Sequence, residues 1–348
     1  MKKFKTVSIF YFSGTGNAQK IDSWFAEAAS TRGIRSCISN IDLSDGYSSQ
    51  NYMDSNMLLV FISPVHGFNY PKIMLNFIRR FPKGDNQVVL MNTRAGIRIA
   101  KTVLPGLTGI TFLLSSLILI NKGYRIVGQI PFDMPSNWIS LHPALGKKSV
   151  EFIYSKNILL VKRYFESLYS GNLVFISFKD IIQDLLIAPV ALAYYFVGRY
   201  FFAKSFYSNT HCNQCNICVE KCPVRAIKMV HDRPFWSLKC ESCMRCMNNC
   251  PVRAIETTHG LWFILFPLTI ALTSFFYNLL FGEVYLHWII RFILFNILFM
   301  VLLILSYRLH HWLLGTKTIN RLISFTSFTH YRFWGRYKAP SEYKKNVD

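Results

Sequence analysis

Apolar and polar positions alternate in blocks through the first 130 residues, and the blocks have the lengths of strands and helices. Short β-rich apolar runs predict strands at 5–12, 35–41, 57–63, 87–91 and 124–129. Helices are predicted between them, after residue 17, near 72–81 and near 104–121. Strands that alternate with helices are typical of a doubly wound parallel sheet covered on both faces. We therefore assign residues 1–170 to an α/β domain.

Two longer apolar runs follow towards the C-terminus. Residues 261–281 carry no charged side chain and are long enough to cross the hydrocarbon core of a bilayer. Residues 286–307 form a second candidate span, in which Arg291 lies near one end and can snorkel to the interface. These runs predict a transmembrane helical hairpin within 259–310. The alternative, two helices packed in a soluble core, fits uninterrupted runs of this length poorly.

The charge of the chain favours a membrane location. The 348 residues have a formal net charge of +21, and 51% of them are apolar. A basic surface can face nucleic acid, an anionic leaflet or an acidic protein. No nucleic-acid recognition element is evident, and the spans favour the membrane. The tail at 311–348 is basic and the loop between the spans is nearly neutral, so the positive-inside rule predicts that the tail and the preceding domains are cytoplasmic.

The same cysteine pattern, Cys-x2-Cys-x2-Cys-x3-Cys-Pro, is written twice between residues 212 and 251. Its members are Cys212, Cys215, Cys218 and Cys222, and then Cys240, Cys243, Cys246 and Cys250. This spacing is the signature of paired [4Fe–4S] clusters, in which the fourth cysteine of each run ligates the other cluster. We therefore predict that Cys250 completes the first cluster and Cys222 the second.

Zinc and disulfides are the competing explanations for these cysteines. Zinc ribbons use Cys-x2-Cys pairs but do not require four cysteines in each run with this shared spacing. A disulfide framework is typical of exported chains, and the N-terminal residues do not resemble a signal peptide. The isolated Cys37 is expected to be a buried structural thiol.

A glycine-rich turn joins the first predicted strand to the first helix. It contains Ser13, Gly14, Thr15, Gly16, Asn17 and Ala18. Unpaired backbone N–H groups at the start of a helix bind a phosphate without any lysine. The hydroxyl and amide side chains of the turn can add hydrogen bonds, while its glycines allow close approach. Alone, such a turn is a weak signal, because any tight strand–helix connection can use one.

Other stretches make the signal more specific. Residues 11–17, Tyr-Phe-Ser-Gly-Thr-Gly-Asn, resemble the FMN phosphate loop of flavodoxins, and 134–138, Met-Pro-Ser-Asn-Trp, resemble a stretch of the flavodoxin–ferredoxin fusion family. The order of parts, a flavodoxin-like domain before a two-cluster ferredoxin at 205–258, also resembles that family. The resemblance implies that the loops expected at 63–68 and 92–96 hold the isoalloxazine ring. With the phosphate turn, the implied flavin-binding residues are Pro64, His66, Gly67, Phe68, Asn92, Thr93, Arg94, Gly96 and Trp138.

Individual flavin contacts rest on residue type alone. His66, Phe68 and Trp138 can stack on the ring, although aromatic residues are 16% of the chain and most of them only pack. Arg94 can place a positive charge beside the pyrimidine edge, with a solvated surface arginine as the alternative. The spacing of Glu256 and His259 is interpreted as chance, and no further metal site is predicted.

A third apolar stretch, 185–203, contains Pro189 and Arg199. If it crossed the membrane, the clusters would lie on the opposite side from the flavin and the electron path would break. We therefore expect 171–204 to be a linker with a helix on the membrane surface, and Arg199 and Lys204 near the headgroups.

Together these features predict a membrane-anchored protein that passes electrons between two [4Fe–4S] clusters and FMN. The first alternative is a membrane oxidoreductase that reduces a quinone or another lipophilic substrate, with a pocket among Trp262, Phe266, His287 and Trp288. The second is a redox sensor that controls a membrane partner. Residues 204–260 hold eight basic and four acidic residues, an excess that can balance the clusters, dock an acidic redox protein or lie against anionic lipid. A solvated basic face without a dedicated partner is the remaining alternative.

Overall fold

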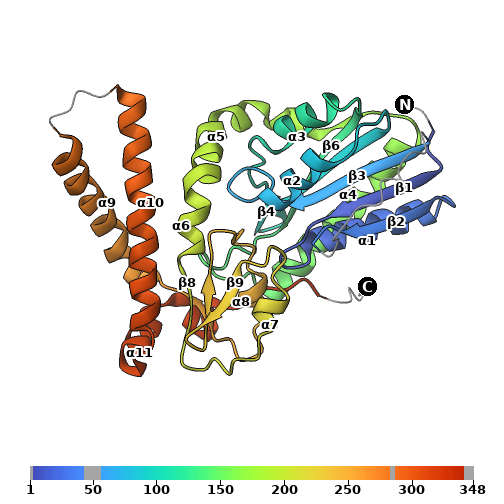
Figure 1. Ribbon diagram of the computed structural model, residues 1–348. Helices are drawn as coiled ribbons and strands as arrows, with labels where there is room; N and C mark the ends of the chain where they lie inside the picture. The colour runs from blue at the N-terminus through green and yellow to red at the C-terminus, as the bar shows by residue number, and fades with distance from the viewer. Residues whose placement is uncertain (1–2, 43–55, 283–286, 341–348) are drawn as a thin grey trace. The chain divides into compact units, whose positions relative to one another are not determined.

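The chain folds into two compact units. The computed structural model describes residues 3–42, 56–282 and 287–340 (Figure 1). Unit 1 comprises Met1–Trp138, Ala144–Tyr195 and the segment from Tyr337 onwards, whereas unit 2 comprises Ile139–Pro143 and Phe196–Arg336. Residues 283–286, which include the expected hairpin loop and the start of the second span, lie outside the described residues. The end of the chain therefore belongs to the same unit as its beginning.

Unit 1 is built on a sheet with the strand order β2-β1-β3-β4-β6-β7. The parallel strands are β1 (Thr6–Tyr11), β2 (Arg35–Asn40), β3 (Met57–Pro64), β4 (Gln87–Ile99), β6 (Arg125–Pro135) and β7 (Val174–Phe175). The short β5 (Thr102–Leu104) pairs antiparallel with the end of β4. The first five parallel strands follow the order 2-1-3-4-5 of the flavodoxin-like doubly wound fold. The predicted fold class is confirmed.

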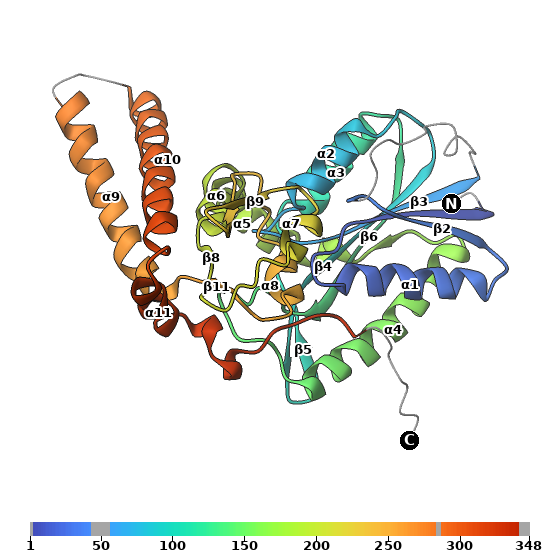
Figure 2. The same ribbon diagram turned by 60° about the horizontal axis from the view of Figure 1, so that its bottom comes forward.

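Helices cover both faces of this sheet (Figure 2). They are α1 (Asn17–Ser30), α2 (Lys72–Arg80), α3 (Thr111–Ile120) and α4 (Lys147–Tyr169). α1 packs with α4 on one face, and α2 packs with α3 on the other. The central residues of β3, Leu58–Ile62, are completely buried, as expected for a strand with helices on both sides.

The structure corrects several sequence predictions in unit 1. β4 was expected to end at Met91, yet it continues to Ile99, because a longer β6 supplies backbone partners from Asn92 to Gly96. Residues 92–96 are therefore strand, and the prediction of a loop there is wrong. α3 begins at Thr111 and not near 104. Cys37 is exposed on β2, a strand at the edge of the sheet, so the expectation of a buried thiol is also wrong.

The ferredoxin part of unit 2 repeats its backbone as it repeats its sequence. Its elements are β8 (Phe206–Ser208), α7 (Ile217–Glu220), β9 (Ile227–Val230), β10 (Arg233–Trp236), α8 (Arg245–Asn249) and β11 (Ile255–Thr257). β8 pairs with β11 and β9 with β10. Left-handed backbone conformations occur at matching places in both cysteine runs, at Asn216 and Met244 and again at Arg225 and Arg253. Equal spacing has thus produced equal local folds.

In the described part of the chain, three helices are long and apolar enough to cross a membrane: the continuous helix Ile176–Ala203, α9 (His259–Phe281) and α10 (Trp288–Leu313). α9 and α10 lie side by side (Figures 1 and 2), with Phe266 packed edge-on against Phe299. Both are close to the predicted spans, although α10 continues six residues past 307.

The helix Ile176–Ala203 combines η2 (Ile176–Asp180), α5 (Ile181–Ala193), a π-helical turn at Tyr194–Gly198 and α6 (Arg199–Ala203). Within unit 1, Asp180 forms an ion pair with Arg94, and Asp184 accepts a hydrogen bond from the backbone of Gly109. An exposed apolar stripe includes Phe178, Ile182, Leu186, Val190 and Phe196.

Arg199 and Lys204 were expected to lie near lipid headgroups. Both residues are buried. The Lys204 ammonium bonds to the carbonyl of Trp236 and lies over the rings of Phe235 and Tyr307. The expectation that these side chains reach lipid headgroups is therefore wrong.

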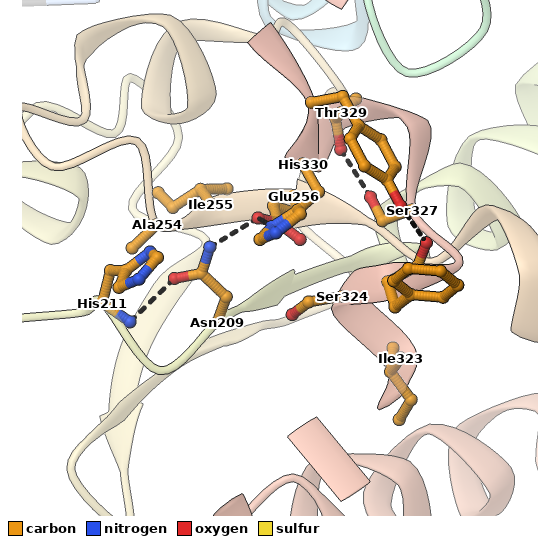
Figure 3. A network of polar contacts seen from close by, with 12 residues as sticks. Asn209, His211, Ala254, Ile255, Glu256, Ile323, Ser324, Ser327, Thr329 and His330 are labelled. Atoms are coloured by element: carbon orange, nitrogen blue, oxygen red, sulfur yellow. Dashed lines mark hydrogen bonds and ion pairs between the residues drawn. The ribbon is translucent and has the colours of Figure 1, made fainter. Parts of the chain in front are cut away.

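The basic C-terminal segment folds onto the ferredoxin strands as α11 (Lys317–Phe325), η4 (Phe328–His330) and η5 (Arg332–Trp334). Glu256 on β11, which is 1% exposed, is the centre of this contact (Figure 3). Its carboxylate accepts hydrogen bonds from Tyr207 and Asn209, at 2.5 Å each, and pairs with His330 at 2.7 Å. A buried carboxylate needs such partners, so the network fastens α11 and η4 to β8 and β11.

Candidate flavin and iron–sulfur sites

The eight cysteines of the repeated motif gather in two groups of four. Cys212, Cys215, Cys218 and Cys250 line one small cavity. The other group brings Cys222 together with Cys240, Cys243 and Cys246. The structure therefore exchanges the fourth cysteines between the runs, in the arrangement that the spacing predicted.

The two exchanged cysteines have equivalent surroundings. The backbone N–H of Ala226 donates to Cys222 Sγ, and that of Ala254 donates to Cys250 Sγ, both at 3.2 Å. Hydrogen bonds to cluster sulfurs are one of the factors that set the reduction potential. In both cases the alanine follows the cysteine by four positions, because the sequence Cys-Pro-Val-Arg-Ala is repeated.

Burial raises the pKa of the thiols in these groups. It raises the pKa of Cys218 and of Cys243 to about 11, with neighbouring cysteines adding to the effect for both. The pKa values of Cys240 and Cys246 are also raised, chiefly by burial. Thiolates gathered in such a place require positive charge, which iron provides. Four cysteine sulfurs gathered in one place are the donor set of a [4Fe–4S] cluster.

Other candidate metal ligands make separate contacts. Glu256 pairs with His330, whereas His259 contacts the backbone of Ser140 and Phe328. Among residues 3–42, 56–282 and 287–340, no three His, Cys, Asp or Glu side chains are arranged to hold a single metal ion.

The phosphate turn of unit 1 lies between β1 and α1. Gly16 precedes the helix with φ +102°, a left-handed conformation that favours glycine. Asn17 and Ala18 are the first two residues of α1, so their N–H groups lie at the positive end of the helix dipole. The geometry suits an anion at this turn.

The polar side chains of the turn form hydrogen bonds within the protein that stabilise the turn. Ser13 Oγ accepts from the N–H of Gly16 at 3.0 Å, and the Asn17 amide donates to the carbonyl of Pro135 at 2.9 Å. Thr15 Oγ1 accepts from Asn137, a residue of the Met-Pro-Ser-Asn-Trp stretch. These bonds join the turn to the segment after β6. Backbone groups are therefore left as the main donors towards a phosphate.

The remaining implied flavin residues lie at the carboxyl ends of adjacent strands. Pro64 ends β3, while His66, Gly67 and Phe68 form the turn after it. Asn92, Thr93, Arg94 and Gly96 lie in the extension of β4, and Trp138 follows β6. β1, β3, β4 and β6 are neighbours in the sheet, so their ends meet at the edge where open α/β sheets bind ligands.

Two polar side chains at this edge fit a bound ligand. Ser63 and Asn92 are register partners across β3 and β4, and both residues are completely buried. Within the described residues, neither the Ser63 hydroxyl nor the Asn92 amide has a hydrogen-bond partner. Buried polar groups are nearly always paired, so these two indicate that a polar ligand completes the site. Flavin offers carbonyl and ring-nitrogen partners of this kind.

Arg94 is not a solvated surface residue. It is 8% exposed, and its guanidinium contacts Asp133 at 2.7 Å and Asp180 at 2.5 Å. Although burial opposes the effect, the two carboxylates raise the pKa of Arg94. These ion pairs hold the linker helix against β4 and β6. A contact between Arg94 and the flavin stays a prediction.

Three tyrosines contribute to this region although the sequence analysis did not identify them. The ring of Tyr194 lies against Gly67, where an added Cβ would come within 2.0 Å of it, and edge-on to Trp138 at 6.0 Å. Tyr154 and Tyr337 both bond to Asn17. No local pattern marks these tyrosines, because each is far from the turn in the sequence. Tyr194 begins a π-helical turn, a feature frequent at functional sites, and the sequence does not show it.

Comparison with known proteins supports the ferredoxin part most directly. The family model described as a 4Fe-4S dicluster domain matches residues 211–255, which contain all eight cysteines of the repeat. No curated protein matched the chain. The chain thus contains a 4Fe–4S ferredoxin domain alongside its flavodoxin-like unit.

Similar solved structures include flavodoxins and larger flavoproteins. A flavodoxin from the domain Archaea is 8% identical, with a TM-score of 0.33, 48% of this chain covered and 97% of the other. General stress protein 14 from Treponema denticola, in complex with FMN, is 12% identical, with a TM-score of 0.31 and coverages of 48% and 98%. Rubredoxin oxygen:oxidoreductase from Desulfovibrio gigas is 11% identical, with a TM-score of 0.31; 48% of this chain is covered, and the match spans only 37% of that protein.

Proposed function

We propose that this protein is a membrane-anchored electron-transfer protein that passes electrons between two [4Fe–4S] clusters and FMN. The observation that carries the proposal is the crossed grouping of the cysteines, with Cys250 beside the first run and Cys222 beside the second. Crossed ligation is the arrangement of two-cluster ferredoxins. The same chain contributes a flavodoxin-like unit with a phosphate turn.

FMN is the proposed second redox group. The backbone of the turn at 13–18 would hold its phosphate, and the strand ends with Ser63, Asn92 and Trp138 would hold its ring. When bound, FMN exchanges one or two electrons, whereas each cluster exchanges one, so the combination joins one-electron and two-electron carriers. The role of the protein is to bind the groups and exclude water from them.

The proposed location is the cytoplasmic face of a membrane. α9 and α10 form the anchor, and the excess of basic residues after them favours the cytoplasm for both units. The helix Ile176–Ala203 is proposed to lie on the membrane surface, because Asp180 and Asp184 fasten one side of it to unit 1 and an apolar stripe is exposed elsewhere on it. We propose an acidic redox protein as the soluble partner, on the basis of the basic ferredoxin segment.

Cofactor analysis tests the proposal. The full-length protein would be purified anaerobically in detergent and analysed for iron, sulfide and extracted flavin, with an EPR spectrum after reduction. Eight iron atoms and one FMN per chain, with interacting signals of two reduced clusters, are expected for two cubanes. Zinc in place of iron in protein never exposed to air would overturn the iron–sulfur assignment. Protein that contains both clusters but no flavin would overturn the proposal that unit 1 binds FMN.

A further inference from the structure

A cavity of about 270 Å³ lies in unit 2, where β11 leads into α9. Four phenylalanines contribute to its walls: Phe201, Phe202, Phe263 and Phe266. This volume lies near the lower end of the sites that bind small organic molecules, and the aromatic lining is typical of them. The pocket expected from the sequence among Trp262, Phe266, His287 and Trp288 differs from it: Phe266 lines the cavity, His287 and Trp288 do not, and the side chain of Trp262 lies outside the described part of the structure.

Two hydroxyls in the lining have no hydrogen-bond partner among the described residues. They belong to Ser140, which is 2% exposed, and to Thr257, which is 4% exposed. The other polar groups of the lining are engaged: His259 contacts the Ser140 carbonyl and the Phe328 N–H, and Ser205 donates to the carbonyl of Phe202. In this otherwise apolar lining, the two hydroxyls are therefore the groups without a hydrogen bond, and a ligand with oxygen atoms would supply their acceptors.

The cavity also borders the apolar surface of α9. Phe263 is 78% exposed and Phe266 is 41% exposed, and both lie in the first third of this candidate membrane span. A molecule dissolved in the bilayer can therefore reach the cavity without passing through water. Thr257 follows Cys250 by seven residues, on the strand that leaves the second cysteine run.

We infer that this cavity binds the head group of a membrane quinone. A quinone ring is flat and apolar, and its two carbonyl oxygens accept hydrogen bonds from donors such as the Ser140 and Thr257 hydroxyls. A lipid acyl chain fills the same space but offers no acceptor to either hydroxyl. The inference rests on the proposed function, which it deepens by naming the lipophilic electron acceptor.

The electrons balance if each reduced cluster supplies one. A quinone then takes up two electrons and two protons from water and becomes the quinol, while both clusters return to their oxidised state. A low-potential electron-donor protein would reduce the clusters again; dithionite replaces it in the test below.

Binding is tested first, without any redox step. The probe is 2-heptyl-4-hydroxyquinoline N-oxide, a quinone-site ligand whose fluorescence is followed as full-length, detergent-solubilised protein is added. Ser140→Ala and Thr257→Val are each expected to weaken binding about fivefold, the value of one ordinary hydrogen bond. The matched control is Thr273→Val, because the Thr273 hydroxyl is also buried in this unit, but bonds to Thr269 on α9 and does not line the cavity.

The redox step is tested second. Dithionite-reduced protein is mixed with decylubiquinone, and the EPR signals of the reduced clusters are followed. Thr257→Val should slow the loss of these signals, whereas Thr273→Val should not. The acyl-chain alternative predicts that Phe266→Ala changes probe binding while both hydroxyl variants leave it unchanged, and this result would overturn the quinone assignment.

The two proposals fail in different ways. If two clusters and FMN are present but the probe does not bind the parent protein, the quinone site is wrong and the proposed function stands. If the probe binds with the expected hydroxyl dependence but iron is absent, the site stands and the electron-transfer function is wrong.

Discussion

The hydroxyl of Tyr337 donates a hydrogen bond of 2.5 Å to the side chain of Asn17, although 320 residues separate the two. Tyr337 is 4% exposed, and Tyr154 bonds to the same pair at 2.9 and 3.3 Å. Two residues later, the N–H of Ala339 donates to the carbonyl of Thr15 at 2.8 Å. The segment from Tyr337 to Ala339 therefore supports the phosphate turn.

Removal of the Tyr337 hydroxyl should loosen this turn. Burial raises the pKa of Tyr337 above that of a free tyrosine, so the group remains a neutral donor at every physiological pH. Tyr337→Phe leaves the Asn17 side-chain oxygen with Tyr154 as its partner, and we expect unit 1 to lose about 1–2 kcal/mol of stability. FMN affinity, measured by flavin fluorescence titration, should fall about five- to tenfold.

The control for this variant is Tyr331→Phe. Tyr331 donates to the carbonyl of Phe325 at an exposed site in unit 2, so its loss should leave FMN affinity unchanged. Equal FMN affinity in Tyr337→Phe and the parent protein would show that the C-terminal segment does not support the turn.

Gly16→Ala should damage the turn more severely. A Cβ at this position would lie 2.6 Å from the Cβ of Ala339, and φ is +102°. Gly33→Ala is the matched control, because Gly33 also has a positive φ, +70°, but nothing lies within 4 Å of the added atom. Both variants should lose about 1–2 kcal/mol from backbone strain. Only Gly16→Ala should also lose FMN binding, and loss of binding in both would mean that global instability is the cause.

The buried carboxyl group of Asp22 on α1 should make the stability of unit 1 depend on pH. The residue is 1% exposed, and burial raises its pKa to about 7. Because the folded state holds this proton more tightly than the unfolded state, the stabilisation is complete below the unfolded pKa and is lost as the pH rises through 7. The total change is roughly 4 kcal/mol between pH 3 and pH 8.

Asp22→Asn removes the titrating group and should therefore be more stable than the parent protein at pH 8. Urea unfolding at pH 5 and pH 8 measures the difference, and Asp85→Asn, at an exposed position, is the control. If the parent protein and Asp22→Asn show the same change in stability between these pH values, Asp22 does not titrate as burial predicts.

The crossed grouping of cysteines predicts which cluster each substitution removes. Cys222→Ser changes the first run in the sequence, yet it should remove or convert the cluster on Cys240, Cys243 and Cys246, because Cys222 lies with that group. Cys218→Ser, four residues earlier, should affect the other cluster. Iron content should fall by up to half in each variant, and the remaining EPR signals should differ between them. Cys37→Ser, at an exposed position on β2, should retain all the iron. Identical remaining spectra for the two variants would contradict the crossed arrangement.

Local patterns were sufficient for the order of strands and helices, although not for all their ends, and for the cysteine groups. The spacing alone predicted that Cys222 and Cys250 each join the other run's group. Two runs with equal spacing form equal turns, as the matching conformations of Asn216 and Met244 show. The alternation of apolar strands and helices likewise predicted the doubly wound sheet, because each strand must bury both faces.

The sequence by itself thus determined the fold class, the crossed cysteines and the apolar spans, all of which depend on residues close together in the chain. Only the tertiary structure decided that 92–96 are strand, that Arg94 pairs with Asp180, and that Tyr194 and Tyr337 lie against Gly67 and Asn17. It also decided that two unpaired hydroxyls share an apolar cavity. The physical reason is that a hydrogen bond or an ion pair needs proximity in space, and contacts between residues far apart in the chain leave no spacing rule in the sequence.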